Sequence, residues 1–217
     1  MLQTDVKLPT GISQRSDATP CVFVVDDDPV VRDALEQLID SAGWAVETYS
    51  RAEDFLARPK LLRPGCVVVD TALPDATGLE LQERLAAHRA APIVFMTRFP
   101  DVPTTVRAIK AGAVEFLVKP LREDLILGAI SQAIERSHAE LRQEAELRAL
   151  RERYTSLTRR EREVLALVVA GRLNKQIAAE LAISEITVKA HRGKVMRKMN
   201  ARSLPALVRI ASKLGVG

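Results

Sequence analysis

Five short aliphatic runs, each followed by a segment with helical spacing, constrain the fold of residues 21–120 more than any other feature. The runs are CVFVV (21–25), AVETY (45–49), CVVVD (66–70), PIVFMT (92–97) and EFLVK (115–119). Helical spacing occupies the segments 30–43, 51–57, 78–88 and 102–112, and two of these end at glycines that suit a helix stop. Strands of nearly continuous Val, Ile and Leu that alternate with helices indicate a parallel sheet covered on both faces. We therefore expect an α/β flavodoxin-like domain with a five-stranded parallel sheet.

Polar side chains stand at the ends of four of these strands. They are Asp26, Asp27 and Asp28 after the first run, Asp70 after the third, Thr97 after the fourth and Lys119 after the fifth. Because ligands of parallel α/β sheets bind outside the carboxyl ends of the strands, we expect these side chains to lie together. Gathered carboxylates repel one another unless a cation joins them, and Mg²⁺ prefers such oxygen ligands. A lysine and a hydroxyl facing the same point are suited to holding a phosphoryl group. We expect Asp28 to be a helix N-terminal charge outside this site.

Four segments resemble the signature elements of response-regulator receiver domains, in the expected order and spacing. They are VFVVDDDPVVR (22–32), VVVDTALPDATG (67–78), FMT (95–97) and EFLVKP (115–120). The resemblance implies that Asp70 accepts a phosphoryl group, and that Mg²⁺ is held by Asp26, Asp27, Asp70 and the backbone carbonyl of Ala72. It also implies that Thr97 is the switch hydroxyl, that Lys119 contacts the phosphoryl group, and that Phe116 is the switch aromatic. The Lys119–Pro120 peptide bond is expected to be cis.

Arg98 departs from the receiver pattern, which usually has a small residue directly after the switch threonine. A long cation beside the phosphoryl pocket can hinder access or add a contact to phosphate. We therefore expect Arg98 to alter the rate of phosphorylation or dephosphorylation without abolishing either.

A long helical stretch, from about Glu123 to Tyr154, follows the α/β segment. Leu147, Leu150, Tyr154 and Leu157 recur at a 3-4-3 spacing, which suits a short coiled-coil seam. A solvated helical linker explains the same residues equally well, and we assign residues 137–155 to a helical linker. The sequence thus divides into a leader (1–19), a receiver (20–136), the linker and a C-terminal domain (156–217).

The C-terminal domain is predicted to be all helical and strongly basic. Residues 155–217 carry thirteen Lys or Arg and four Asp or Glu side chains, whereas residues 1–125 carry 14 and 19. This asymmetry indicates that the C-terminal part meets nucleic acid. We expect four helices, with a capping box from Thr158 to Glu161, a stop at Gly171 and an N-cap at Ser184.

The same domain resembles the NarL/FixJ/LuxR-type helix-turn-helix over residues 156–214. The matching segments are LTRREREVL, NKQIA, LAIS, TVKAHR, VMRKM and SLPALVR, and the style is closest to the FixJ-like subgroup. Helical spacing places Val188, Val195 and Met199 inward on the third helix and leaves the opposite face for a major groove. The resemblance places base contacts near Lys189, Ala190 and Gly193, and because Gly193 has no side chain we expect Lys189 and Lys194 to read bases, with Ala190 against a thymine methyl. Phosphate contacts, which position the protein, are expected from Lys175, Arg192, Arg197 and Lys198, and Thr187 is a further DNA-binding candidate.

The two resemblances together imply a phosphorylation-controlled transcriptional regulator rather than an enzyme. A histidine kinase would phosphorylate Asp70, and the protein would then dimerise, bind double-stranded promoter DNA in the cytoplasm and act on RNA polymerase. Two alternatives stay open, a phosphorylation-independent transcription factor whose receiver only dimerises, and a signalling adaptor whose basic tail binds protein. Cys21 and Cys66 lack metal-ligand spacing and are expected to be buried, reduced thiols. No membrane contact is expected, because no apolar stretch is long enough to span a bilayer.

Overall fold

The computed structural model describes residues 19–58, 63–87 and 91–216. The leader expected over residues 1–19 lies outside this part except for its last residue. The chain divides between Glu140 and Leu141 into two compact units. In the described part, no helix is long and apolar enough to cross a membrane.

The first unit is the expected α/β domain. Its strands are β1 (Cys21–Val25), β2 (Ala45–Tyr49), β3 (Gly65–Asp70), β4 (Ile93–Thr97) and β5 (Glu115–Val118). Its helices are α1 (Pro29–Ser41), α2 (Ala52–Ala57), α3 (Gly78–Ala87), α4 (Val102–Lys110) and the start of α5 (Glu123–Thr155). All four strand pairings are parallel, in the order β2-β1-β3-β4-β5, which confirms the predicted five-stranded sheet.

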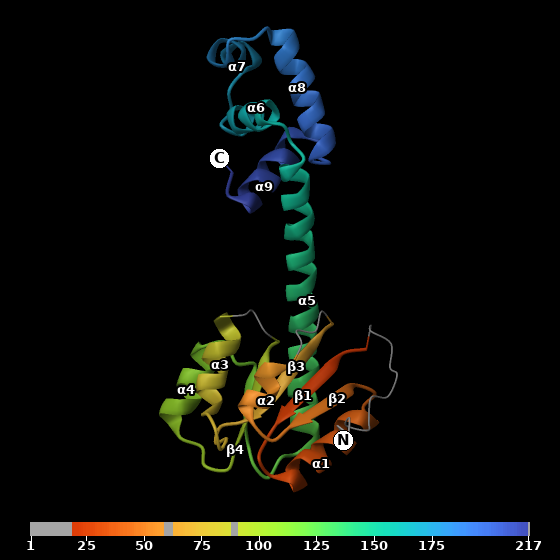
Figure 1. The fold of residues 1–217 in the computed structure, drawn as a ribbon, viewed down its shortest axis with the longest axis vertical. Coiled ribbons are helices and arrows are strands. Elements are labelled where there is room, and N and C mark those ends of the chain that lie inside the picture. Colours follow the sequence, from red (N-terminus) through yellow and green to blue (C-terminus); the bar gives the residue numbers. More distant parts are fainter. Residues whose placement is uncertain (1–18, 59–62, 88–90, 217) are drawn as a thin grey trace, which may run out of the picture. The chain divides into compact units, whose positions relative to one another are not determined.

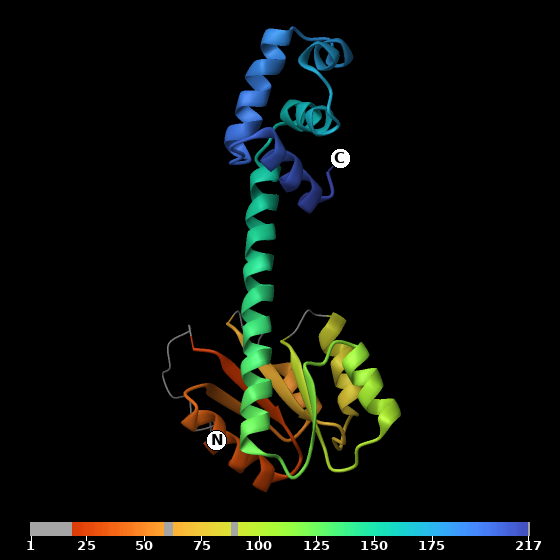
Figure 2. The ribbon, with the colours of Figure 1, turned by 180° about the vertical axis from the view of Figure 1, so that it is seen from behind.

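Alternate residues of the central strands point to opposite faces of the sheet, and each face has its own core. Phe23, Val67 and Phe95 pack with residues of α2, α3 and α4, the helices in front of the sheet in Figure 1. Val24 and Val68 pack with residues of α1 and α5, which cover the other face in Figure 2. Cys21 and Cys66 are buried in different cores and are free, as predicted.

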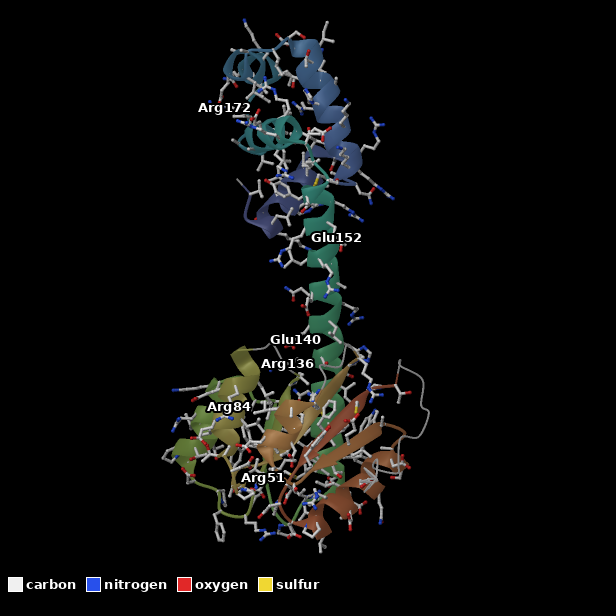
Figure 3. The ribbon with its side chains drawn as sticks, viewed as in Figure 1. Arg51, Arg84, Arg136, Glu140, Glu152 and Arg172 are labelled. Atoms are coloured by element: carbon white, nitrogen blue, oxygen red, sulfur yellow. The ribbon has the colours of Figure 1, made fainter. Side chains whose placement is uncertain are left out.

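Several polar contacts hold α5 against the first unit. Arg136 donates to the carbonyl of Gly112 over 3.0 Å and to Glu140 over 2.8 Å, and Figure 3 shows Arg136 and Glu140 on this helix. The Ser137 hydroxyl accepts the backbone N–H of Gly65 at 3.2 Å. The helix is thus tied to the start of β3 and to the loop before β5, while the Arg136–Glu140 pair lies within the helix.

The second unit is built from the end of α5 and four further helices. These are α6 (Arg159–Val169), α7 (Asn174–Leu181), α8 (Glu185–Lys198) and α9 (Leu204–Leu214). The capping box of Thr158 and Glu161, the positive φ of Gly171 and the N-cap of Ser184 are all as predicted. Val188, Val195 and Met199 are buried in the core of this unit, which confirms the predicted inward face of α8.

The suggested coiled-coil seam packs within the chain instead. Leu150 and Leu157 are buried, and both Tyr154 and Leu157 join the core of the second unit. Lys213 of α9 also forms an ion pair with Glu146 over 2.8 Å. The 3-4-3 spacing therefore reflects packing of the end of α5 against its own domain. Part of the stretch predicted as a linker, from Leu141 onward, belongs to this unit.

Candidate functional site

The polar strand ends of the first unit meet at one edge of the sheet. Asp26 follows β1, Asp70 and Thr97 end β3 and β4, and Lys119 follows β5. Because the strands are parallel, their carboxyl ends share an edge, so residues up to 93 positions apart in the sequence come into contact. The structure therefore brings these four predicted residues together. The predicted cis Lys119–Pro120 bond is present directly after the lysine.

Lys119 joins the two buried carboxylates at the centre of this edge. Its ammonium donates to Asp26 Oδ2 over 2.5 Å and also to Asp70 Oδ2. The Asp26 side chain is fully buried, and the side chains of Lys119 and Asp70 are each only 8% exposed. Burial raises the pKa of Asp26, and the hydrogen bond from Lys119 opposes that rise. The pair of carboxylates is therefore tolerated because an ammonium lies between them.

Backbone N–H groups fix the other oxygen of each carboxylate. Asp26 Oδ1 accepts the N–H of Asp28 at 3.0 Å, and Asp70 Oδ1 accepts the N–H of Ala72 at 2.8 Å. The carboxylates are consequently oriented as well as neutralised. One oxygen of Asp70 faces the Lys119 ammonium. The same ammonium can therefore neutralise an anionic group that is transferred to Asp70.

The donor set of this edge fits Mg²⁺ in its chemistry. The metal prefers oxygen ligands, and Asp26, Asp70 and the carbonyl of the exposed Ala72 supply them close together in the fold. Asp27 is exposed. Within the described residues, no three acidic, histidine or cysteine side chains converge as they would around a bound ion. Asp27 therefore stays a predicted ligand whose side chain would have to turn towards the Asp26–Asp70 pair.

Thr97 is buried and hydrogen-bonded to its neighbouring strand end. Its hydroxyl lies 2.9 Å from that of Thr71 and accepts the backbone N–H of Phe99 at 3.2 Å. Phe116, the predicted switch aromatic, is half-buried with its ring 5.8 Å from that of Phe95 on the neighbouring strand. Thr71 was not anticipated from the sequence, although its place directly after Asp70 puts it at the same edge.

Arg98 pairs with Asp28. The guanidinium lies 2.5 Å from Asp28 Oδ2, so the loops that follow β4 and β1 are linked. Asp28 also caps α1 by accepting the N–H of Val30 at 3.0 Å, as expected of an N-terminal charge. The N–H of Val30 and, to a smaller extent, Arg98 hold the pKa of Asp28 below its ordinary range. Arg98 and Lys119 line the same cavity of about 540 Å³ beside α1.

Asp75 and Gly78 shape the loop after Asp70, and sequence reasoning assigned neither a role. Asp75 accepts the N–H groups of Ala52 and Glu53 at 3.1 and 2.9 Å, which ties this loop to the start of α2. At Gly78, a Cβ would lie 2.9 Å from the Asp70 carbonyl oxygen. A side chain there would therefore displace the end of β3 that carries Asp70. The acidic residue followed by a glycine three positions later was the available signal for such a turn.

In the second unit, α8 presents a basic face to solvent. Lys189, Ala190, Gly193, Lys194 and Arg197 are exposed, as predicted, opposite the buried residues of the helix. None of the hydrogen bonds or ion pairs within the described residues engages the side chains of Lys189, Lys194 or Arg197. The exposed Lys175 on α7 is equally unengaged there. These four cations are therefore available to an anionic partner.

Three of the other predicted DNA contacts already have partners in the chain. Arg192 donates to Asn174 Oδ1 over 2.7 Å, and the hydroxyl of Thr187 lies 2.8 Å from that of the N-cap Ser184. Lys198 forms an ion pair with the buried Glu161 over 2.7 Å. These contacts give the side chains structural roles, which the basic composition alone did not reveal.

Sequence reasoning also passed over exposed residues beside this face. Arg172 and Leu173 lie in the turn before α7, where Figure 3 labels the arginine, and Ile186 lies in the first turn of α8. Ile186 is 80% exposed. The sequence shows an isoleucine in the first turn of this helix, but it does not show that the side chain is exposed.

Comparisons with known proteins match both units. Residues 22–131 match the model of the response regulator receiver domain, and residues 155–211 match that of the bacterial regulatory proteins of the luxR family. The response regulator protein TodT of Pseudomonas putida is 41% identical over 206 residues, covering 94% of this chain and 91% of that protein. The transcriptional regulatory protein FixJ of Bradyrhizobium diazoefficiens is 41% identical over 196 residues, covering 90% and 96%. Among solved structures, the response regulator StyR aligns with a TM-score of 0.80 and 47% identity, covering 90% of this chain and 100% of that chain.

Proposed function

The chain belongs to the two-component response regulators that join a receiver domain to a LuxR-type DNA-binding domain, and from this premise we propose that Asp70 is its phosphorylation switch. Proteins of this family are transcription factors and not enzymes. The observation that carries the proposal is the pairing of Asp70 with Lys119 at the edge where Asp26 and Thr97 also lie. Histidine kinases and DNA are the partners that such a regulator implies.

The chemistry follows from the orientation of the Asp70 carboxylate. A carboxylate oxygen of Asp70 attacks the phosphorus of a kinase phosphohistidine, a P–O bond forms, and the P–N bond to the histidine breaks. Lys119, already hydrogen-bonded to Asp70, is placed to hold a transferred phosphoryl oxygen. Asp26, Asp27, Asp70 and the carbonyl of Ala72 are the proposed ligands of Mg²⁺, which when bound neutralises charge on the phosphoryl oxygens.

The switch is proposed to run from Thr97 to Phe116. The hydroxyl of Thr97 now accepts a hydrogen bond from Thr71, and a phosphoryl group on Asp70 offers a strongly charged acceptor for the proton of the Thr97 hydroxyl. Movement of Thr97 frees space that the half-buried ring of Phe116 can take. This changes the surface of β5, and we propose that the phosphorylated protein dimerises and engages promoter DNA in the cytoplasm, where it acts on RNA polymerase.

DNA binding is assigned to α7 and α8. We propose that Lys189, Ala190 and Lys194 read base edges while Lys175 and Arg197 contact phosphates. The exposure and free charge of the four cations support this division. Thr187, Arg192 and Lys198 stay predicted contacts, with Arg192 and Lys198 holding Asn174 and Glu161 in the free protein.

Sedimentation in the presence of Mg²⁺, with and without beryllofluoride, tests the switch on the wild type and Asp70→Ala. We expect the wild type alone to shift from monomer to dimer and to gain affinity for duplex DNA. If the variant responds as the wild type does, or if the wild type changes in neither property, Asp70 is not the switch. The second result would favour the phosphorylation-independent alternative, provided that salt-dependent DNA binding persists.

A further inference from the structure

The first turn of α8 carries an isoleucine that the fold does not use. Ile186 is 80% exposed and is absent from the core of the second unit, which takes Val188, Val195 and Met199 from the same helix. The turn is held by Ser184, whose hydroxyl accepts the N–H of Thr187 at 3.1 Å. The isoleucine side chain therefore contributes little to folding and gains only when another molecule covers it.

Ile186 continues the exposed face of the helix. Residues three, four and seven positions later lie on the same side of an α-helix, and here they are Lys189, Ala190 and Gly193. All are exposed, and a Cβ on Gly193 would meet nothing within 4 Å. The face thus combines two apolar side chains and a bare stretch of backbone with the ammonium of Lys189. The solvent-facing side of a surface helix usually carries charged and polar residues.

We propose that Ile186, together with Ala190, contacts the 5-methyl groups of thymines in the major groove. The inference rests on the proposed function, because it takes α8 as the helix that enters DNA. Thymine is the one base that presents an apolar group in the major groove, and the first residues of a recognition helix reach the base edges. The free ammonium of Lys189 and that of Lys194 flank the apolar pair. This charge favours a duplex over an apolar protein surface as the partner.

Replacement of thymine by deoxyuridine isolates the contact, because it removes the 5-methyl group and leaves base pairing intact. Sequences are first selected from a random duplex library with the full-length protein in Mg²⁺ and beryllofluoride. The enriched duplex is then made with each thymine replaced in turn. We expect the wild type to bind about fourfold more weakly at one or two positions, the factor for one buried methyl group. Ile186→Ala should bind the thymine duplex more weakly and lose the discrimination at the position that Ile186 contacts.

Leu173→Ala is the matched control, since Leu173 is 69% exposed in the same unit but lies outside α8. It should keep the wild-type preference for thymine. Equal binding of thymine and uracil duplexes by the wild type would overturn the inference while leaving the proposed function intact. Full discrimination in Ile186→Ala would also overturn it, and unchanged DNA affinity in that variant would indicate a protein partner instead. If the wild type selects no sequence and binds DNA without salt dependence, the proposed function itself fails.

Discussion

Removal of the Lys119 ammonium should destabilise the first unit and make its stability depend on Mg²⁺. Lys119→Met keeps the side-chain length but leaves Asp26 and Asp70, both buried, without their shared cation. Removing one partner of a buried ion pair costs about 3–5 kcal/mol. The Asp70 side chain stays 8% exposed, so water can partly relax its charge and we expect the lower end, about 3 kcal/mol. This is a large part of a total unfolding free energy of about 5–15 kcal/mol.

Urea denaturation followed by tryptophan fluorescence measures this effect, because Trp44, the one tryptophan of the chain, packs against the core of the first unit. In EDTA the variant should lose about 3 kcal/mol, whereas Lys110→Met, an exposed lysine on α4, should match the wild type. A ligand at 100 times its Kd stabilises by about 2.7 kcal/mol. We expect Mg²⁺ to stabilise Lys119→Met more than the wild type, in which an ammonium already occupies the space between the carboxylates. Equal stability of the variant and the wild type in EDTA, or an equal gain from Mg²⁺, would refute this reasoning.

Three further changes separate the roles of individual charges. Arg98→Ala should keep the unfolding free energy within about 1 kcal/mol of the wild type, because its ion pair with Asp28 is partly exposed. It should change the phosphorylation or dephosphorylation rate of Asp70, and unchanged rates in a phosphotransfer assay would contradict this. Hydrogen bonds, first from Lys198, lower the pKa of Glu161, so its stabilisation is present at neutral pH and is lost as the pH falls from about 5 through that pKa. Glu161→Gln should therefore flatten the acid limb of a thermal-denaturation series, and an unchanged limb would count against the pair. Lys175→Ala should reduce the salt slope of DNA binding by about 0.9 for every sequence, so a loss confined to one sequence would show base reading.

The sheet and most helix ends could be predicted because their signals are local. A run of about five Val, Ile and Leu residues is enough to indicate a buried strand, and a capping box spans four positions. Neither signal depends on contacts with distant residues. The strand-end site was predictable for a related reason. Parallel strands bring their carboxyl ends to one edge, so the topology places Asp70 and Lys119 at the same edge even though β4 lies between their strands.

Contacts between distant side chains could not be predicted in this way. The Arg98–Asp28 pair joins residues 70 positions apart, and the Lys198–Glu161 pair joins residues 37 apart. Each depends on rotamers and loop positions that no local pattern encodes. The 3-4-3 spacing on α5 is a different case, because such a spacing states only that one face is covered. Tyr154 and Leu157 have the same spacing whether a second chain or their own domain covers them.

The charge of the C-terminal unit shows why this distinction matters for function. Counting thirteen basic side chains over residues 155–217 correctly indicated an anionic partner, but it gave every cation equal weight. The fold pairs Lys198 with Glu161, and pairs both Arg159 and Arg160 with Glu163, all of which involve α6. The exposed cations of α8 have no such acidic partner among the described residues. The acidic residues of α6 neutralise nearby cations, whereas the cations of α8 stay free beside Ile186 and Ala190, so the same surface can attract DNA by charge and select it by apolar contact.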